Sequence, residues 1–438
     1  MNVNKKKLLE RALRFMARVV LRKYHPIIIG ITGSVGKSST KEAIALIVSR
    51  TYFIRKAEGN YNNEIGIPLT IIGTKSGKSS LFAWGKIVCK WLWMVIFPVR
   101  YPEVLVLEMG IDRPLDMEYL LSFVPVKIGV VTQISSSHIA FFGSIGNIAK
   151  EKSKLLSALP PDGFAILNSD DKNVVKMQEK TRAKALTYGF GLDAMLRADN
   201  LLFHRDVKRV EGFSFKLNYE GKTIPVRLPK IIARHHIPGA LAAAAVGVAL
   251  KMNLVEIAEA LENFEPLPGR LCLLPGKNGM ILLDDTYNAS PVSTRAALET
   301  LGEFMAPRKV VILGDMLELG ADATQEHTIL VTDIVASGAQ IVVTVGKHMR
   351  SLYDALLSSG FPSRQAYWFP SPSSILESLP SIVRSEDLIL IKGSRGMRME
   401  KITEALLMDP SAREKLLCCQ SEEWRRRPFI EPAEWENV

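Results

Sequence analysis

Short runs of apolar residues recur along the chain, and each is followed at once by glycine or polar residues. Between the runs, apolar residues return at helical spacing, as at Ala43, Ile44, Ile47 and Val48. Continuous apolar runs separated by helices are typical of parallel sheets that are covered on both faces. The runs lie at residues 27–29, 104–107, 128–131, 164–167, 280–283, 310–313 and 388–391.

Residues 265–269, Glu-Pro-Leu-Pro-Gly, interrupt this pattern with two prolines and a glycine. Apolar runs occur on both sides of this point, which predicts two sheets. A chain of 438 residues is also too long for one hydrophobic core. We therefore expect a domain over residues 27–268 and a second domain over residues 269–438.

The first 25 residues are strongly basic. They contain eight lysines and arginines against Glu10 alone, and so carry seven of the eleven net positive charges. The rest of the chain is only mildly basic, and no nucleic-acid partner is needed to explain its charge. Leu9, Leu13, Met16 and Val20 predict an amphipathic helix within residues 1–26. It either packs on its own protein or binds anionic lipid.

Residues 77–101 form an aromatic insertion, and three of the six tryptophans lie within residues 81–99. Lys86 and Lys90 interrupt this segment, and lysines are costly at the centre of a bilayer. Three interpretations remain open: a membrane span, a helix on the membrane surface, and a helix packed against protein. Residues 1–25 and 81–99 are thus candidates for peripheral membrane contact.

An apolar run, a glycine-rich loop and a helical pattern follow one another from residue 27, in the order of a P-loop. Backbone N–H groups at a helix start bind phosphate, Lys37 reaches the β- and γ-phosphates, and the Ser38 hydroxyl can bind Mg²⁺. The strict motif has glycine where this chain has Ile31. The nucleotide-binding candidates are Thr32, Gly33, Ser34, Val35, Gly36, Lys37, Ser38 and Ser39.

Together with this loop, residues 60–70 (Asn-Tyr-Asn-Asn-Glu-Ile-Gly-Ile-Pro-Leu-Thr) and 108–110 (Glu-Met-Gly) resemble the Mur ligases of peptidoglycan synthesis. Residues 284–291, 314–320 and 392–395 resemble the MurF type. That type uses ATP to join D-alanyl-D-alanine to UDP-N-acetylmuramoyl-tripeptide through an acyl phosphate. The resemblance implies an α/β fold, with a central P-loop parallel-sheet domain followed by a Rossmann-like α/β C-terminal domain. It also implies a cytoplasmic enzyme, which the small number of cysteines, four, fits.

The resemblance also implies roles for single residues. Ser38 would hold one Mg²⁺ with ATP, and Glu108 and His138 would hold a second. Lys152 matches a family lysine that CO₂ converts to a carbamate. The catalytic candidates are therefore Lys37, His138 and Lys152. In the C-terminal half, the implied nucleotide residues are Arg270, Asp285, Tyr287 and Asn288, and the implied substrate residues are Asn62, Asn63, Lys392 and Arg395.

The chain departs from this family pattern in two places. Where the family has asparagines near adenine, this chain has His236 and Gly239; a histidine can still bond a base edge, so His236 stays a nucleotide candidate. The MurF pattern also has a UDP-binding domain before the P-loop, for which 26 residues are too few. Alternatives are therefore a different amino acid or dipeptide, a lipid- or polymer-linked acceptor at the inner face of the membrane, or a nucleotide-binding scaffold without catalysis.

Overall fold

The computed structural model describes the chain except for residues 1–2, 60, 79, 136–138, 207–208 and 427–438. The chain divides into two compact units. The N-terminal unit comprises Met1–Leu202, Ser214–Leu228 and His236–Phe264, and the C-terminal unit comprises Phe203–Phe213, Pro229–His235 and Glu265–Val438. Residues 203–213, 229–235 and 265–268 thus belong to the C-terminal unit. In the first of these segments, the Phe203 ring stacks on the Phe213 ring and contacts the Phe304 ring edge to face.

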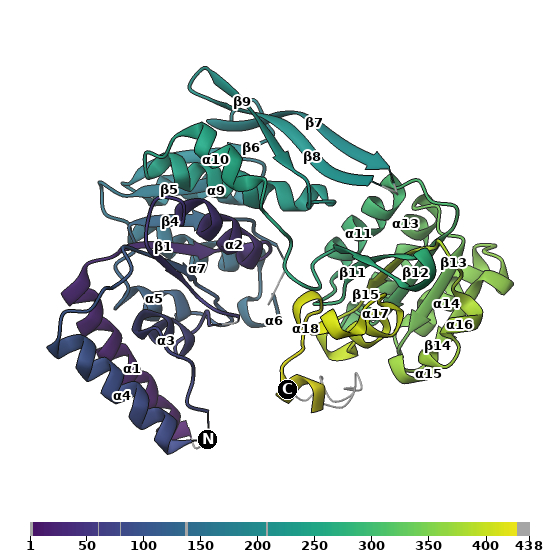
Figure 1. Ribbon diagram of the computed structural model, residues 1–438, viewed down its shortest axis with the longest axis horizontal. Coiled ribbons are helices and arrows are strands. Elements are labelled where there is room, and N and C mark those ends of the chain that lie inside the picture. Colours follow the sequence, from purple (N-terminus) through teal and green to yellow (C-terminus); the bar gives the residue numbers. More distant parts are fainter. Residues whose placement is uncertain (1–2, 60, 79, 136–138, 207–208, 427–438) are drawn as a thin grey trace. The chain divides into compact units, whose positions relative to one another are not determined.

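A nine-stranded sheet forms the centre of the N-terminal unit (Figure 1). Its order is β2 (Ile54–Lys56), β3 (Val104–Glu108), β1 (Ile27–Thr32), β4 (Ile128–Val131), β5 (Phe164–Asn168), β6 (Lys184–Gly189), β7 (Leu196–Asp206), β8 (Arg209–Tyr219) and β9 (Lys222–Leu228). The pairs from β2 to β7 are parallel. In this register Ile31 lies beside Glu108, and Thr32 lies beside Val131. The carboxyl ends of β1, β3 and β4 therefore meet at one edge.

Helices cover both faces of the parallel part of this sheet. On one face, α2 (Lys37–Val48) packs against α9 (Ile237–Ala249) and α10 (Leu254–Leu261). On the other, a single apolar core includes residues of α1 (Val3–Tyr24), α3 (Gly66–Ile72), α4 (Leu81–Ile96), α5 (Asp116–Leu121) and α7 (Ile145–Ser157). Two shorter helices are α6 (Ile139–Phe142) and α8 (Lys172–Val175). Among the helices that the structure describes, none is both long and apolar enough to cross a membrane.

The C-terminal unit has a six-stranded sheet. Its order is β10 (Cys272–Pro275), β11 (Ile281–Asp285), β15 (Leu388–Lys392), β12 (Lys309–Gly314), β13 (Ile341–Val345) and β14 (Ala366–Phe369). Only the β10–β11 pair among these is antiparallel. Along β12, Val311 and Leu313 belong to one apolar core, while Val310 and Ile312 belong to another. Both faces are thus buried, as the continuous apolar runs predict.

The two cores of this unit lie under different helices. One includes residues of α11 (Pro291–Glu303), α13 (Leu330–Ala336) and α14 (Met349–Ser358), and the other includes residues of α15 (Pro372–Leu376), α16 (Leu379–Ile382) and α17 (Glu400–Leu406). The remaining helices are α12 (Ala323–Thr328), α18 (Arg413–Leu416) and α19 (Glu422–Arg426). Short 3₁₀ turns are η1 (Lys176–Lys180), η2 (Arg234–His236), η3 (Lys277–Gly279), η4 (Gly320–Asp322), η5 (Ser363–Gln365), η6 (Arg395–Met397) and η7 (Pro410–Ala412). The predicted α/β fold class is confirmed.

Candidate active site

The glycine loop joins the end of β1 to the start of α2. Gly33 has φ 148° and Gly36 has φ 84°, and L side chains rarely adopt either conformation. A Cβ atom at Gly33 would lie 1.9 Å from Thr132 Oγ1, so a larger residue would clash there. The loop therefore needs these glycines, and it ends at the first turn of α2, where backbone N–H groups have no helical partners and can bind an anion.

The end of β4 holds this loop in place. Thr132 Oγ1 donates a 2.6 Å hydrogen bond to the carbonyl of Val35, and the backbone N–H of Ser34 donates to the carbonyl of Gln133 over 2.6 Å. Ser34 Oγ also donates to the carbonyl of Ser135. Thr132 is a positioning residue absent from the predicted site residues. The polar residues that follow the apolar run at 128–131 are the sequence signal for it.

Lys37 lies over its own loop. Its Nζ donates to the carbonyl of Gly33 over 2.9 Å and to that of Ser34 over 3.4 Å. The ammonium group is thus held beside the loop N–H groups, where phosphate oxygens would compete with these carbonyls for it.

A carboxylate and a hydroxyl meet beside the loop. Ser38 Oγ donates to Glu108 Oε2 over 2.8 Å, and Asn62 Nδ2 donates to Glu108 Oε1 over 3.3 Å. Glu108 is buried at the end of β3 because its strand pairs with β1. Hydroxyl and carboxylate oxygens are the hard ligands that Mg²⁺ prefers, so the donor set fits this ion. His138 lies outside the described residues, and among the described ones no group of three or more His, Cys, Asp or Glu side chains is placed so that it could hold a metal ion.

Lys152 reaches the same loop from α7. Its Nζ donates to the carbonyl of Gly33 over 3.0 Å, and the residue is only 3% exposed. Burial, and secondarily the charge of Lys37, lower the pKa of Lys152 from 10.5 to about 7. A substantial share of this amine is therefore neutral, and so nucleophilic, near pH 7.

The neighbours of Lys152 have other roles. Glu151 Oε1 accepts hydrogen bonds from the backbone N–H groups of Leu115 and Met117, at the start of α5. Lys154 pairs with Glu151 over 2.8 Å, and Lys150 is exposed. Of these three lysines, Lys152 is the one that bonds the phosphate loop.

Other predicted residues of this unit lie at helix starts. Asn63 Oδ1 accepts from the backbone N–H groups of Ile65 and Gly66, where α3 begins. His236 is buried directly before α9. A Cβ atom at Gly239 would lie 3.3 Å from Thr40 Oγ1, so the glycine allows α9 to approach α2 closely. This packing gives a physical reason for glycine at a position where the family pattern has asparagine.

The C-terminal unit brings a second predicted group together. Asp285 and Lys392 pair in the β11–β15 register, and Lys392 Nζ lies 2.6 Å from Asp285 Oδ2 and donates to the carbonyl of Asn288 over 2.9 Å. Lys392 is 1% exposed, and burial lowers its pKa against the opposing effect of Asp285. The two side chains thus form a buried ion pair at the strand ends.

Aromatic rings contact the predicted arginines of this unit. The guanidinium of Arg270 lies 4.0 Å from the centre of the Tyr287 ring, and that of Arg395 lies 5.2 Å from it. Arg395 also lies 4.2 Å from the ring centre of Trp424, in α19. The sequence pattern gave no role to Trp424 of the C-terminal tail, because the contact with Arg395 joins segments far apart in the chain.

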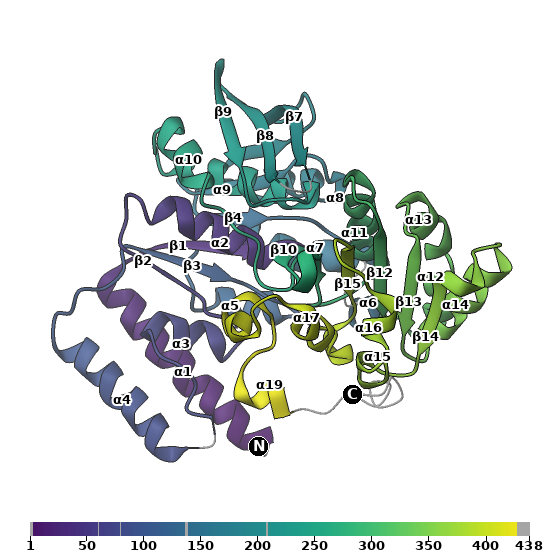
Figure 2. The ribbon, with the colours of Figure 1, turned by 45° about the vertical axis from the view of Figure 1, so that its right-hand side comes forward.

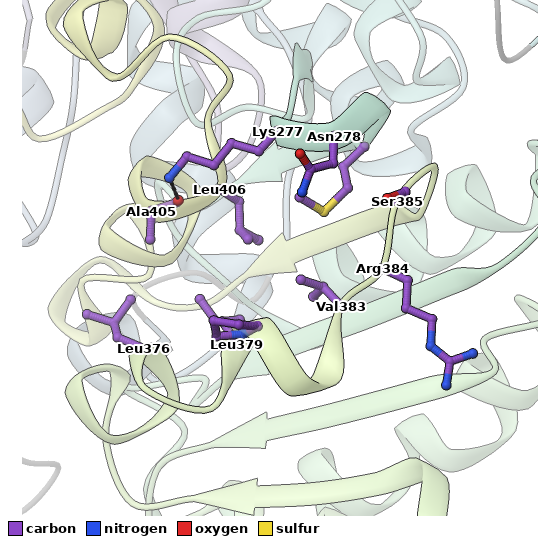
Figure 3. A pocket seen from close by; sticks show the side chains of 11 residues that line it. Lys277, Asn278, Leu376, Leu379, Val383, Arg384, Ser385, Ala405 and Leu406 are labelled. Carbon is purple, nitrogen blue, oxygen red and sulfur yellow. Dashed lines mark hydrogen bonds between the residues drawn. The ribbon is translucent and has the colours of Figure 1, made fainter.

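A separate pocket of about 450 Å³ lies in the C-terminal unit (Figure 3). Lys277 and Arg384 contribute cations to its lining, and Lys277 Nζ donates to the carbonyl of Ala405 over 2.7 Å. Leu376, Leu379 and the other lining residues are not among the predicted site residues. The pocket therefore adds nothing to the group around Asp285 and Lys392.

Two family models match the chain. The Mur ligase middle domain matches residues 31–83 and 95–247, and the Mur ligase glutamate ligase domain matches residues 269–395. Both lie in the order expected from the sequence motifs, and residues 84–94, within α4, fall between the two matched segments of the first model.

The chain is similar to proteins named UDP-N-acetylmuramoyl-tripeptide–D-alanyl-D-alanine ligase. That of Escherichia coli (strain K12) is 29% identical over 381 residues, which cover 86% of this chain and 76% of the relative. That of Bacillus subtilis (strain 168) is 28% identical, with 91% and 80% covered. A crystal structure of MurF from Acinetobacter baumannii matches with a TM-score of 0.74 and 25% identity, over 90% of this chain and 79% of that one. The chain therefore belongs to the Mur ligase family, with its relatives in the MurF branch.

Proposed function

We propose that the protein is an ATP-dependent ligase that adds D-alanyl-D-alanine to a muramoyl-tripeptide precursor of peptidoglycan. The names of the relatives support the substrates. The observation that carries the proposal is the convergence of Lys37, Ser38, Glu108 and Lys152 on one phosphate loop. A nucleotide-binding scaffold without catalysis would have no need for a carboxylate–hydroxyl pair and a buried amine beside this loop.

The proposed reaction has two steps. An oxygen of the substrate carboxylate bonds to the γ-phosphorus of ATP, and ADP leaves. The amino group of the dipeptide then attacks the acyl carbon of the acyl phosphate, an amide forms, and inorganic phosphate leaves as the amine loses a proton. In both steps negative charge builds up on phosphate oxygens, which Lys37 and the loop N–H groups can stabilise.

The residues beside the loop would hold the metal. Ser38 Oγ and the Glu108 carboxylate supply oxygen ligands, and Asn62 fixes the second oxygen of Glu108. Mg²⁺ would neutralise phosphate charge there. We propose that Lys152 is carbamylated, because its neutral amine can attack CO₂ and because a carbamate would add anionic oxygens beside the loop. His138 stays a proposed ligand of a second Mg²⁺.

In the C-terminal unit we propose that Arg270, Asp285, Tyr287 and Asn288 contact the nucleotide, and that Lys392 and Arg395 bind substrate carboxylates. Because Lys392 is bonded to Asp285, a substrate carboxylate would have to compete with that residue for the ammonium group. Arg395 lies among aromatic rings, a setting in which guanidinium groups remain charged and keep several N–H donors. In the N-terminal unit we propose likewise that His236 contacts the nucleotide and that Asn63 contacts the substrate.

The decisive experiment combines phosphate release with mass spectrometry of the product. Purified protein, ATP and Mg²⁺ are supplied with muramoyl-tripeptide, with D-alanyl-D-alanine, or with both. We expect phosphate release only with both substrates, and a product whose mass equals their sum less one water. If phosphate is released only when a different amino acid, dipeptide or lipid-linked acceptor is supplied, that compound is the substrate in place of the one proposed. No release with any acceptor would contradict the ligase proposal itself.

We further propose that the protein works in the cytoplasm, where ATP is available. Residues 1–25 and 81–99 would give it a peripheral contact with the inner face of the membrane.

A further inference from the structure

Helix α4 is apolar on two opposite sides. Trp84, Ile87, Trp91 and Met94 face the core that α4 shares with α1 and α3. The other side is exposed: Leu81 is 88% exposed, Phe82 74% and Ile96 65%. Further exposed apolar residues on α4 and directly after it are Val88, Leu92, Trp93 and Phe97.

These exposed residues form one stripe. Leu81, Val88, Leu92 and Ile96 lie one or two helical turns apart along one line, in which Gly85 fills the gap, and Phe82 and Trp93 lie beside it. A helix on the surface of a water-soluble unit is normally polar on its outer side. A stripe of this length on a surface helix indicates a binding surface.

Helix α1 extends this surface. The two helices lie side by side in both views (Figures 1 and 2). Trp91 Nε1 donates to the carbonyl of Met16 over 3.0 Å, and Lys23 Nζ donates to the carbonyls of Met94 and Phe97 at the end of α4. Phe15 of α1 lies 6.1 Å from the Trp91 ring and is itself exposed. The outer sides of α1 and α4 are therefore parts of one surface.

Basic residues flank the apolar stripe. On α1, the exposed residues Lys7, Arg11 and Arg22 share the outer side with Leu8 and Phe15, at the spacing of a helix. On α4, Lys86 Nζ lies 4.7 Å from the centre of the Phe82 ring. We name the outer sides of α1 and α4, with their exposed apolar and basic residues, the α1–α4 face.

Acidic residues are scarce on the α1–α4 face. The sequence of α4 contains no acidic residue, and that of α1 contains only Glu10, whose Oε1 lies 3.6 Å from Lys6 Nζ. A surface whose apolar centre holds Phe82, Trp93 and Phe97, flanked by cations, complements the interface of an anionic bilayer. A protein partner would need an apolar groove with acidic residues around it. An anionic bilayer offers an apolar interior and negative headgroups over its whole surface.

The Mur ligase middle-domain model does not match most of α4. Residues 84–94 fall outside the match, although both ends of the helix and the residues around it are matched. The middle of the exposed stripe therefore lies in a segment that the family pattern does not describe.

We infer that the α1–α4 face binds the surface of an anionic bilayer. Helix α4 lies in the plane of the interface, with Phe82, Trp93 and Ile96 at the boundary between headgroups and acyl chains. Lys7, Arg11 and Arg22 lie against lipid phosphates. This inference gives the peripheral contact a defined orientation, and it holds whether or not the proposed ligase reaction is correct, because binding needs no turnover.

Vesicle co-sedimentation of the full chain tests the inference. Vesicles of phosphatidylcholine are compared with vesicles in which about one third of the lipid is phosphatidylglycerol, at low salt. We expect much stronger binding to the anionic vesicles and a blue shift of tryptophan fluorescence. Each cation at an anionic surface contributes about fivefold in partitioning, so the variant K7Q/R11Q/R22Q should bind roughly a hundredfold more weakly.

Matched variants separate a specific face from general charge. The variant K172Q/K176Q/K180Q makes the same change in net charge at exposed lysines of α8 and η1, and it should bind like the wild type. F82D/W93D should lose binding, whereas L192D/M195D, which adds the same two negative charges at other exposed apolar residues, should retain it. Circular dichroism confirms that each variant is folded.

Three results would overturn the inference. Wild-type protein that fails to bind anionic vesicles at low salt would do so directly, as would equal losses in the face variants and the charge-matched variant. The third is self-association that F82D/W93D abolishes, without vesicle binding, since the face would then join two copies of the chain. Ligase activity measured without vesicles is a separate result, so failure of one proposal is distinguishable from failure of the other.

Discussion

The burial of Lys152 makes a quantitative prediction about its chemistry. An amine with a pKa of 10.5 is neutral in about one molecule in a thousand at pH 7.5, whereas one with a pKa of about 7 is neutral in roughly three quarters. Only the neutral amine attacks CO₂; the new N–C bond yields a carbamate, and a proton passes to water. The Lys152 site therefore holds several hundred times more reactive amine than an ordinary lysine.

Carbon-13 NMR with labelled bicarbonate measures this directly. We expect a carbamate signal in the wild type that is absent from Lys152→Ala and retained in Lys150→Ala, which alters an exposed lysine of the same helix. The signal should already form near pH 7. In the ligase assay Lys152→Ala should lose about two to three orders of magnitude in turnover, because an anionic group beside the phosphate loop is lost, and small carboxylates such as acetate should restore part of it.

Three results would refute this reasoning. A carbamate signal that survives in Lys152→Ala would belong to another lysine. A signal that rises only near pH 10 would mean that the Lys152 amine is not shifted by its surroundings. If the variant keeps full turnover with or without acetate, Lys152 has no part in the reaction.

Four further predictions concern the two clusters of polar residues and the buried Asp284, whose Oδ1 accepts hydrogen bonds from the Thr286 and Thr403 hydroxyls. Lys37→Ala should keep its thermal stability but lose about two orders of magnitude or more in turnover, measured by phosphate release, because the cation for the phosphates is gone. Glu108→Gln should raise the Mg²⁺ concentration for half-maximal activity at least about tenfold, measured by Mg²⁺ titration, because one anionic ligand becomes neutral. Lys392→Met should lower the free energy of unfolding by about 3–5 kcal/mol in urea titrations, since Asp285 is left buried without its partner. Asp284→Asn should change the pH dependence of the free energy of unfolding. Burial raises the pKa of Asp284 to about 7, so this carboxyl contributes stability that is fully present below its ordinary pKa of 3.8 and is lost as the pH rises through 7. Between pH 4 and 7 the free energy of unfolding of the variant should therefore rise relative to that of the wild type by up to about 4 kcal/mol.

Each of these has a contrary result. An unfolded Lys37→Ala protein would make that residue structural, and an unchanged Mg²⁺ requirement in Glu108→Gln would remove it from the metal site. Unchanged stability in Lys392→Met would show that the ion pair contributes little. A constant stability difference between pH 4 and 7 would show that Asp284 titrates normally in the folded protein.

The sequence predicted the parts of the fold that depend on local pattern. Continuous apolar runs identified strands buried on both faces, and the glycine loop identified the β1–α2 junction, because Gly33 and Gly36 adopt conformations that other residues avoid. Glu108 and Asp285 each follow an apolar run, so each could be expected at the carboxyl edge of its own sheet.

Other features depend on packing between segments far apart in the chain. The sequence does not show that Lys392 is bonded to Asp285, or that Thr132 holds the phosphate loop, because both contacts depend on strand register. It also left the environment of residues 81–99 open, since α4 has apolar residues on both sides and periodicity alone does not tell which of them faces the core. Family resemblance supplied the proposed role of Lys152, and the structure adds its burial.

Lys37 and Lys152 share one acceptor, the carbonyl oxygen of Gly33. Because both amines bond the same oxygen, the order in which the nucleotide and CO₂ bind would matter for the loop. A bound triphosphate would draw Lys37 toward itself, and its negative charge would favour the protonated form of the Lys152 amine, which does not react with CO₂. If Lys152 is carbamylated as we propose, capture of CO₂ would be favoured in the empty loop, before ATP binds, and the supply of CO₂ would set how much of the protein carries the carbamate when the nucleotide arrives.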